Sequence, residues 1–388
     1  SIMKKLIYLF LVVPSILFCQ KIEKIQIKGE KEFGKREVLI YTPIEYYDNS
    51  RMFEVIYVFD AQYREFFDVV HSTIAFQNHG IRPMIVVGIC SENRNFDFLP
   101  KSENKSTIKE QFGQLGGADL FLNFIDKTVI PFIENKYRTI PNRIGIGYSN
   151  GATFINYAML LKPNLFDVIF SIDANFKFDN GILINLLEDS EISLSDKFVY
   201  YTCQTPVSNN WIDYSNKFNK LLDSKSSFKI ISERFNNESH SSVYQQAVIN
   251  ALKEYYKYQF FDSKNLITYL KTLEENKSYN LSLSELHGIA SIFKNFNMVK
   301  DAKNILLAFQ EKLNLPINGY DIYSLFETAD LYFSIGLLDK ARKYFEYCDK
   351  VLDEKKKKYV KHYGQEFYNI GKEKVREKIN HIDQIKVE

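Results

Sequence analysis

Gly147-Tyr148-Ser149-Asn150-Gly151 is the stretch that decides the fold of this chain. It stands between a short apolar run at residues 143–146 and a helix-like run at residues 152–161. A strand, a tight turn and a helix form the setting in which a G-x-S-x-G motif places a serine at the tip of a strand. The flanking glycines let the strand and the helix pass closely, because they carry no Cβ atom. The sequence therefore predicts an α/β fold that presents the Ser149 hydroxyl.

Length and composition set the outer bounds. The chain has 388 residues, which is enough for one large α/β domain and a smaller one. The formal net charge is only +2, so no nucleic acid and no membrane surface is expected as a partner. Cys90, Cys203 and Cys348 are too few and too widely spaced for a disulfide framework or a metal site. We therefore expect neither a metal nor a cofactor.

Residues 1–19 are predicted to be a signal peptide. Lys4 and Lys5 form a charged start, and residues 6–18 are an apolar run of signal-peptide length that is too short to span a bilayer. Cleavage near Cys19 implies a periplasmic or secreted protein. Lipid anchoring through Cys19 is the less favoured alternative, because Leu17 and Phe18 do not match the small residues usual before such a site.

Buried strands and helices alternate over the next 200 residues. Residues 22–28 and 37–41 alternate apolar and polar side chains and predict a first antiparallel pair. Residues 119–136 have apolar side chains at helical spacing. Continuous apolar runs, typical of strands buried on both faces, occur at residues 54–59, 83–89, 167–172, 198–202 and 228–231. This alternation predicts a mostly parallel sheet covered on both faces.

Polar residues follow the predicted strand ends, where sites in parallel sheets lie. We therefore expect one rim to be lined by Asp60, Gln62, Glu92, Ser149, Asp173, Gln204 and His240.

After about residue 266 the chain is predicted to be helical throughout. Small and aromatic residues recur with a period of 39, as in Ala302 and Ala341, at the offsets of a tetratricopeptide helix pair. The predicted division is an α/β domain at residues 20–262 and a small all-α, tetratricopeptide-like domain at residues 263–388. A protein partner for this helical tail is one expectation that follows.

A serine nucleophile needs an imidazole to accept its proton. Three of the six histidines, His287, His362 and His381, lie in the helical region, while His71 and His79 precede the serine. Only His240 follows Ser149 within the α/β region, in a loop between a strand and a helix. His240 is therefore the predicted base.

The oxyanion hole is expected from backbone N–H groups. Topology assigns the N–H of Asn150 and one near Ala61 or Gln62, after the strand at residues 54–59.

Residues 35–260 resemble the esterase family of the α/β-hydrolase superfamily, the group with S-formylglutathione hydrolases and enterochelin (ferric siderophore) esterases. The resemblance rests on six blocks, namely Val58-Phe59-Asp60-Ala61-Gln62, Val86-Val87-Gly88-Ile89, Asn93-Arg94-Asn95-Phe96-Asp97-Phe98-Leu99-Pro100, the Ser149 motif, Pro163-Asn164-Leu165-Phe166-Asp167 and His240-Ser241-Ser242-Val243. It implies an α/β-hydrolase fold, with Ser149 as nucleophile and His240 as base. Arg94 and Asp97 are expected to brace the rim, with substrate contact by Arg94 as the alternative.

The acid is where the sequence departs from the family. In relatives that have one, it follows the strand equivalent to residues 198–202, and the first carboxylate here is Asp213. Glu233, Glu238 or no acid at all are the alternatives, with Asn209 in the acid's place. Asp173 corresponds to a substrate-facing loop of relatives, so it is predicted to bind substrate with Tyr148 and Arg94.

These features predict a secreted serine hydrolase of small-molecule carboxylic esters. The aromatic residues predicted at the rim favour siderophore or aromatic acyl esters, namely Tyr63, Phe96, Phe98, Tyr148, Phe176, Phe178 and Trp211. One alternative is a hydrolase-like binding protein with weak catalysis, suggested by the ill-defined acid and the helical tail. Amide or peptide hydrolysis at the same site is another.

Overall fold

The computed structural model describes residues 21–29, 33–47, 51–76, 83–189, 198–260, 262–275, 281–314 and 321–387. The predicted signal peptide, Cys19 and His79 lie outside these residues. The chain forms two compact units that meet in sequence at Ala251 and Leu252, near the predicted division at residues 262 and 263. Among the described residues, no helix has both the length and the apolar character that crossing a membrane requires.

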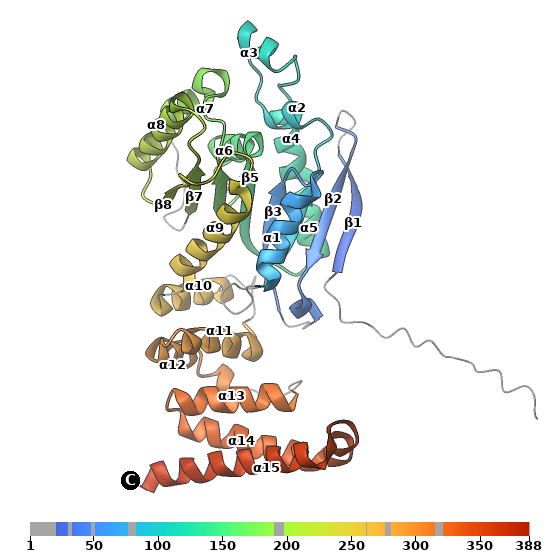
Figure 1. Ribbon diagram of the computed structural model, residues 1–388, viewed down its shortest axis with the longest axis vertical. Coiled ribbons are helices and arrows are strands. Elements are labelled where there is room, and N and C mark those ends of the chain that lie inside the picture. Colours follow the sequence, from blue (N-terminus) through green and yellow to red (C-terminus); the bar gives the residue numbers. More distant parts are fainter. Residues whose placement is uncertain are drawn as a thin grey trace, which may run out of the picture. The chain divides into compact units, whose positions relative to one another are not determined.

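The first unit is built on an eight-stranded sheet with the order β1-β2-β4-β3-β5-β6-β7-β8 (Figure 1). As predicted, β1 and β2 form an antiparallel pair, and β2 is also antiparallel to β4. The remaining pairs are all parallel. The strands are β1 (Lys21–Lys28), β2 (Lys35–Thr42), β3 (Phe53–Phe59), β4 (Ile85–Ile89), β5 (Thr139–Tyr148), β6 (Val168–Ile172), β7 (Val199–Gln204) and β8 (Lys229–Arg234).

The apolar runs became strands because both sides of the sheet are covered. Every residue of β3, β4, β6 and β7 is buried, as expected for parallel strands between two helical layers. Tyr57 and Val87 are register partners and both are fully buried. The parallel register brings the carboxyl ends of these strands to one edge of the sheet, where Ser149 follows β5 and Asp173 follows β6.

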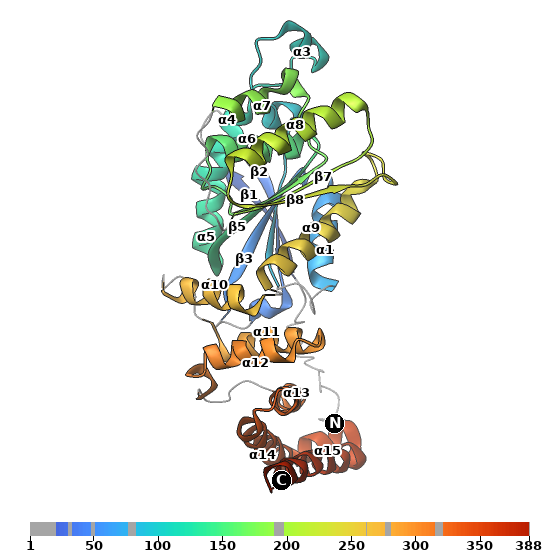
Figure 2. The same ribbon diagram turned by 90° about the vertical axis from the view of Figure 1, so that its left-hand side faces the viewer.

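Helices lie on both faces (Figure 2). α1 (Arg64–Phe76) and the start of α9 (Val243–Phe260) share one face, where the rings of Phe66 and Tyr244 are 4.6 Å apart. The other face carries α4 (Ala118–Phe124) and α5 (Ile130–Lys136), joined by the π-helical turn Ile125–Val129, with α6 (Asn150–Leu161), α7 (Phe178–Asp189) and α8 (Asn209–Lys225). Short helical segments are the 3₁₀ turn Ile44–Tyr47, α2 (Arg94–Phe98) and α3 (Lys105–Glu110).

The cysteines behave as small apolar residues. Cys90, Cys203 and Cys348 are free and buried. Burial raises the pKa of the Cys90 and Cys348 thiols to about 12. They therefore stay protonated at neutral pH, which makes them unreactive packing groups.

The second unit is helical, as predicted. Its helices are α10 (Ser263–Glu275), α11 (Leu283–Asn295), α12 (Val299–Ala308), α13 (Ile322–Ser334), α14 (Leu338–Glu354) and α15 (Lys356–Val387), with the 3₁₀ turn Lys312–Asn314. The turn residues Asn297 and Gly336, 39 residues apart, both have positive φ and join α11 to α12 and α13 to α14. Ala302 and Ala341 are fully buried. Turn residues and buried alanines therefore recur 39 residues apart in the described part of this unit.

Candidate active site

Ser149 sits on a strained turn between β5 and α6. Its φ of 57° and ψ of −120° are unusual for a residue with a side chain. A Cβ atom on Gly147 would lie 2.3 Å from the carbonyl oxygen of Gly151, so only glycine allows the chain to double back here. The N–H of Ser149 donates to the carbonyl of Ile172 at 3.0 Å, which ties the turn to β6. This geometry holds the serine hydroxyl clear of its own backbone, as the sequence predicted.

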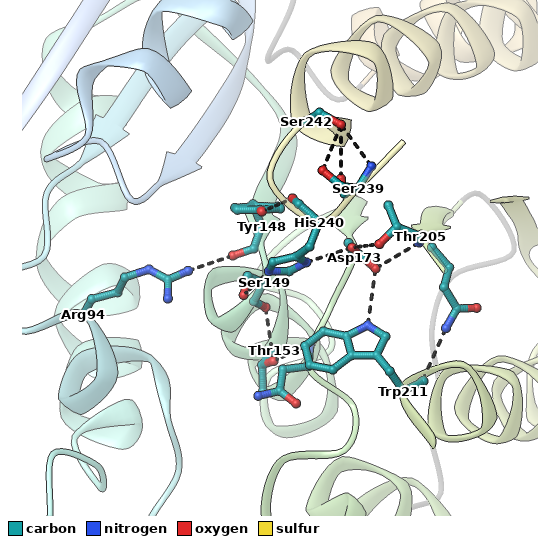
Figure 3. A network of polar contacts seen from close by, with 12 residues as sticks. Arg94, Tyr148, Ser149, Thr153, Asp173, Thr205, Trp211, Ser239, His240 and Ser242 are labelled. Carbon is teal, nitrogen blue, oxygen red and sulfur yellow. Dashed lines mark hydrogen bonds and ion pairs between the residues drawn. The ribbon is translucent and has the colours of Figure 1, made fainter. Parts of the chain in front are cut away.

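His240 lies between Ser149 and Asp173 (Figure 3). Its Nε2 is 3.1 Å from Ser149 Oγ, and its Nδ1 is 2.8 Å from Asp173 Oδ2. The imidazole stacks on the Tyr148 ring at 4.9 Å and meets the Trp211 ring edge-on at 5.5 Å. The Tyr148 hydroxyl also donates to the His240 carbonyl oxygen. His240 lies in the loop between β8 and α9. Contacts to its imidazole ring and a hydrogen bond to its backbone carbonyl therefore both hold it in place.

Asp173 is a buried carboxylate whose charge is satisfied by hydrogen bonds. It is 1% exposed and follows β6 directly, with a φ of 46°. Besides His240 Nδ1, its oxygens accept from the N–H of Thr205 at 3.2 Å, from Thr205 Oγ1 at 2.5 Å and from Trp211 Nε1 at 3.3 Å. These convergent donors satisfy the hydrogen-bonding capacity of a buried carboxylate. Asp173 thus has the position that orients an imidazole.

The expectation for the acid is therefore corrected. Asp213 is exposed on α8, two residues beyond Trp211, and the carboxylate that reaches His240 is Asp173. Glu233 instead accepts from Tyr201 and Asn250, and Glu238 accepts from Ser242. The prediction of Asp173 as a substrate-binding rim residue is also wrong, because its side chain is buried behind His240. The side chain of Asn209 lies outside the described part of the structure.

Arg94, on α2, connects the ends of two strands. Its Nε is 2.8 Å from both carboxylate oxygens of Asp60, which follows β3, and its Nη2 donates to the carbonyl of Tyr148 at 3.2 Å. Asp60 is fully buried, and burial raises the pKa of its carboxyl group while Arg94 and Gln62 oppose that shift. Arg94 therefore holds the residue before Ser149 against the loop after β3. Asp97, also buried, accepts from Ser91 at 2.7 Å.

Of the predicted oxyanion donors, the N–H of Ala61 is already used in a backbone hydrogen bond, while those of Gln62 and Asn150 are still candidates. The N–H of Ala61 donates to the carbonyl of Ile89 at 3.2 Å, so it belongs to the sheet, and this prediction is corrected. Gln62 is fixed by its side chain, which accepts from the N–H of Ser91 at 2.9 Å and donates to Asp60 at 2.8 Å. Asn150 is the first residue of α6, where N–H groups lack partners within the helix. Gln62 and Asn150 remain the candidates.

Only part of the predicted aromatic rim lies at the surface. Phe98, Phe176 and Phe178 are 4% exposed or less and belong to the core. Tyr63 is 54% exposed. Phe96, Tyr148 and Trp211 are half-buried, and the Tyr148 and Trp211 rings contact His240.

Sequence reasoning overlooked Thr205 and two amides beside the serine. Asn95 Oδ1 accepts from Asn150 Nδ2 at 3.1 Å, and Asn150 Oδ1 accepts from Asn175 Nδ2 at 3.3 Å. Asn175 follows Asp173 by two residues, and Asn95 lies within the block around Arg94. Their positions shortly after strand ends are the sequence signal that could have identified them.

The fold and these contacts define the first unit as an α/β-hydrolase with the geometry of a serine hydrolase. Residues 33–177 match the family described as "Putative esterase". The match covers the part of the α/β unit that holds Ser149 and Asp173, and the solved structures compared below share the fold of the unit. The matched residues include Ser149 and Asp173 and end before His240.

Similarity to known proteins agrees with this assignment. Uncharacterized protein YbbA of Bacillus subtilis (strain 168) is 28% identical over 159 residues, which are 39% of this chain and 62% of that protein. The match thus spans less than two thirds of that relative. Two solved structures share the fold. An IroE-like serine hydrolase from Shewanella oneidensis has a TM-score of 0.61 and 20% identity, over 75% of this chain and 99% of the other. The siderophore hydrolase EstA from Aspergillus nidulans has a TM-score of 0.52 and 18% identity, over 62% and 95%.

Proposed function

We propose that this protein hydrolyses carboxylic esters through an acyl-enzyme on Ser149. The observation that supports this proposal most directly is the chain of hydrogen bonds from Ser149 Oγ through His240 to Asp173, at 3.1 and 2.8 Å. A serine hydroxyl is a poor nucleophile unless a base in hydrogen-bond contact accepts its proton. The match of residues 33–177 to the family described as "Putative esterase" supports ester hydrolysis as the reaction.

The first half-reaction forms the acyl-enzyme. Ser149 Oγ attacks the ester carbonyl carbon while His240 Nε2 accepts the hydroxyl proton. Asp173 stabilises the resulting imidazolium, and the N–H groups of Gln62 and Asn150 donate to the oxyanion. The tetrahedral intermediate then expels the alcohol, which takes the proton from His240.

The second half-reaction regenerates the enzyme. Water attacks the acyl carbon while His240 accepts one of its protons, and the carboxylic acid leaves as Ser149 recovers its own. Tyr148 keeps the imidazole in place through both steps. Burial raises the pKa of the Tyr148 hydroxyl to about 12, so it stays protonated and continues to donate at neutral pH.

For the substrate we propose siderophore or aromatic acyl esters. Tyr63, Phe96 and Trp211 supply exposed or half-buried aromatic surface near the serine. A structural neighbour is a siderophore hydrolase. The position of Asp173 removes the main reason for the alternative of a weakly catalytic binding protein, which was the lack of an acid.

For the location we propose the periplasm or the exterior of the cell, on the strength of the charged start and the apolar run in residues 3–18. Fractionation of cells that express the full chain tests this. Recovery of the protein in the cytoplasm alone, with residues 1–19 intact, contradicts it.

The first prediction concerns Ser149→Ala. The variant should lose at least about 10³-fold in kcat on 4-nitrophenyl acetate, because no acyl-enzyme can form. A fluorophosphonate probe should label the unmodified protein and not this variant.

The matched control is Ser224→Ala, an exposed serine on α8, which should retain full turnover and labelling. Unchanged ester turnover by Ser149→Ala would overturn the proposal. Cleavage of a 4-nitroanilide at a rate comparable to the ester would extend the reaction class to amides.

A further inference from the structure

We propose that Phe112 contacts the substrate and selects esters that carry an extended aryl or alkyl group. This inference rests on the proposed function and deepens it, because it assigns the outer part of the substrate to one residue outside the catalytic contacts. Phe112 lies in the connection between α2 and α4, which we call the α3 loop (residues 99–117). Figures 1 and 2 show that α3 projects beyond the edge of the sheet where α2 and α6 begin.

The α3 loop is hydrogen-bonded to the residue after the serine. Asn150 Nδ2 donates to Asn95 Oδ1 at 3.1 Å, and Asn95 Nδ2 donates to Gln111 Oε1 at 3.2 Å. Gln111 immediately precedes Phe112. Two hydrogen bonds therefore separate the Asn150 side chain from the residue next to Phe112, which fixes the tip of the loop relative to Ser149.

The loop is also fixed to the segment that follows Asp173. Thr107 Oγ1 donates to Asp179 Oδ1 at 2.9 Å. Asp179, Asn180 and Gly181 have three successive positive φ values, so this segment has a defined, non-helical turn at the contact. The α3 loop is thus linked to Asn150, at the start of α6, through Asn95, and to the start of α7 through Asp179.

Phe112 occupies a backbone position that usually belongs to glycine. The N–H of Phe112 donates to the carbonyl of Lys109 and the N–H of Gly113 donates to the carbonyl of Ile108, which is the Schellman pattern at a helix end. The left-handed residue of that pattern is most often glycine, and here it is phenylalanine with a φ of 51°. The strained residue carries a large apolar side chain where local geometry favours none.

The Phe112 ring gains nothing from packing within this unit. It is 90% exposed. Single exposed apolar residues are common and need no explanation by themselves. In Phe112 the exposure coincides with backbone strain and with a neighbour, Gln111, that is linked through Asn95 to Asn150. Strain of this kind clusters at ligand-binding segments. Tyr63, which follows β3 at the same edge of the sheet, is also exposed, so apolar contact is available from a second loop.

The test compares two 4-nitrophenyl esters, the acetate and the 6-phenylhexanoate, which share a leaving group and differ in reach. In Phe112→Ala, the KM for the 6-phenylhexanoate should rise about tenfold, since one apolar contact in an enzyme pocket is worth roughly that much. Turnover of the acetate should change by less than about twofold, because the acetyl group stays at Ser149. Phe112→Tyr should restore the KM for the longer ester.

Phe76→Ala is the matched control. Phe76 is 86% exposed at the end of α1, and α1 runs back from the carboxyl edge of the sheet to the opposite edge. This variant should leave both esters unaffected. If Phe112→Ala changes neither ester, or changes both equally, the inference is overturned while ester hydrolysis stands. If the unmodified protein hydrolyses neither ester, the proposed function fails and the inference falls with it.

Discussion

Asp173 is the residue on which the energetics of the site depend most. Its carboxylate is buried, and donors from Thr205, Trp211 and His240 surround it. Removing its charge would leave these donors facing a group that no longer stabilises an imidazolium. Removing a buried, hydrogen-bonded charge costs free energy, because its former partners stay buried without a hydrogen bond or water to replace it.

We predict that Asp173→Asn lowers kcat by roughly 10²–10⁴-fold with a smaller change in KM, because the imidazole loses both its tautomer and its counter-charge. Steady-state kinetics with 4-nitrophenyl acetate measures this. Asp213→Asn is the control and should be indistinguishable from the unmodified protein, since Asp213 is exposed on α8. A large loss in Asp213→Asn with none in Asp173→Asn would reverse the structural assignment.

Ser149 and His240 could be predicted from the sequence because each has a local or an ordinal signal. Ser149 lies in a glycine-flanked turn, and His240 is the only histidine after it in the α/β region. Asp173 had no such signal. Loops after β6 and after β7 both lie at the same edge, and only the backbone turn at Asp173, with its φ of 46°, directs the carboxylate toward His240. That direction is a tertiary property.

Among the elements, the β5–α6 turn is the least tolerant of added atoms. The carbonyl of Gly151 faces Gly147 across the turn, backbone against backbone. A side chain can rotate away from a clash, but two main chains joined by a tight turn must separate. The turn and the catalytic geometry therefore share one constraint.

We predict that Gly147→Ala destabilises the α/β unit by roughly 2–4 kcal/mol and removes most esterase activity, because the added methyl group displaces the turn that carries Ser149. Urea unfolding followed by circular dichroism measures the change. Gly288→Ala is the comparison, since a Cβ atom there meets nothing within 4 Å, and it should keep full activity. Stability of Gly147→Ala equal to that of the unmodified protein would refute this interpretation of the turn.

Strands were easier to predict than the short helices. The buried strands are mostly apolar, so their pattern can be recognised without tertiary information. Residues 91–114 show no long apolar periodicity, yet they contain α2 and α3. Asn93 and Asn104 cap these two helices. The helices themselves are too short to be stable without tertiary contacts, such as the ion pair between Arg94 and Asp60.

At the scale of the whole molecule, the stability of the helical unit should depend on pH through one buried histidine. The helical unit contains His287, a buried imidazole whose Nε2 is 2.5 Å from the Tyr332 hydroxyl. Burial lowers the pKa of His287 to about 3. The folded unit therefore keeps this side chain neutral at pH values where an unfolded chain would protonate it.

We predict that the free energy of unfolding of the helical unit falls by about 2 kcal/mol between pH 7 and pH 5. The unfolded state binds a proton below a pH of about 6.5, while the folded state does so only near pH 3, so stability is lost as the pH falls through this window. Urea unfolding at both pH values measures the slope. His287→Gln should flatten it and His362→Gln, an exposed control, should not; equal slopes in all three proteins would contradict the assignment.

The sequence could predict that this unit is all-helical, because small and aromatic residues recur in it every 39 residues. The positive-φ turns at Asn297 and Gly336 have the same separation. A protein partner for it remains a prediction, since the pattern identifies a scaffold and not its ligand. The division between the units falls inside α9, a position that composition alone does not mark, because a helix continues through it.

Trp211 gives the molecule an optical property of its own. It is the only tryptophan in the chain, and its indole N–H bonds to Asp173 while its ring meets His240 edge-on. Tryptophan fluorescence excited selectively at the indole ring therefore comes from one residue, Trp211, beside the His240 imidazole. If Ser149 and His240 act as proposed, the fluorescence of the native protein would report proton transfer at His240 and acylation at Ser149 without a label.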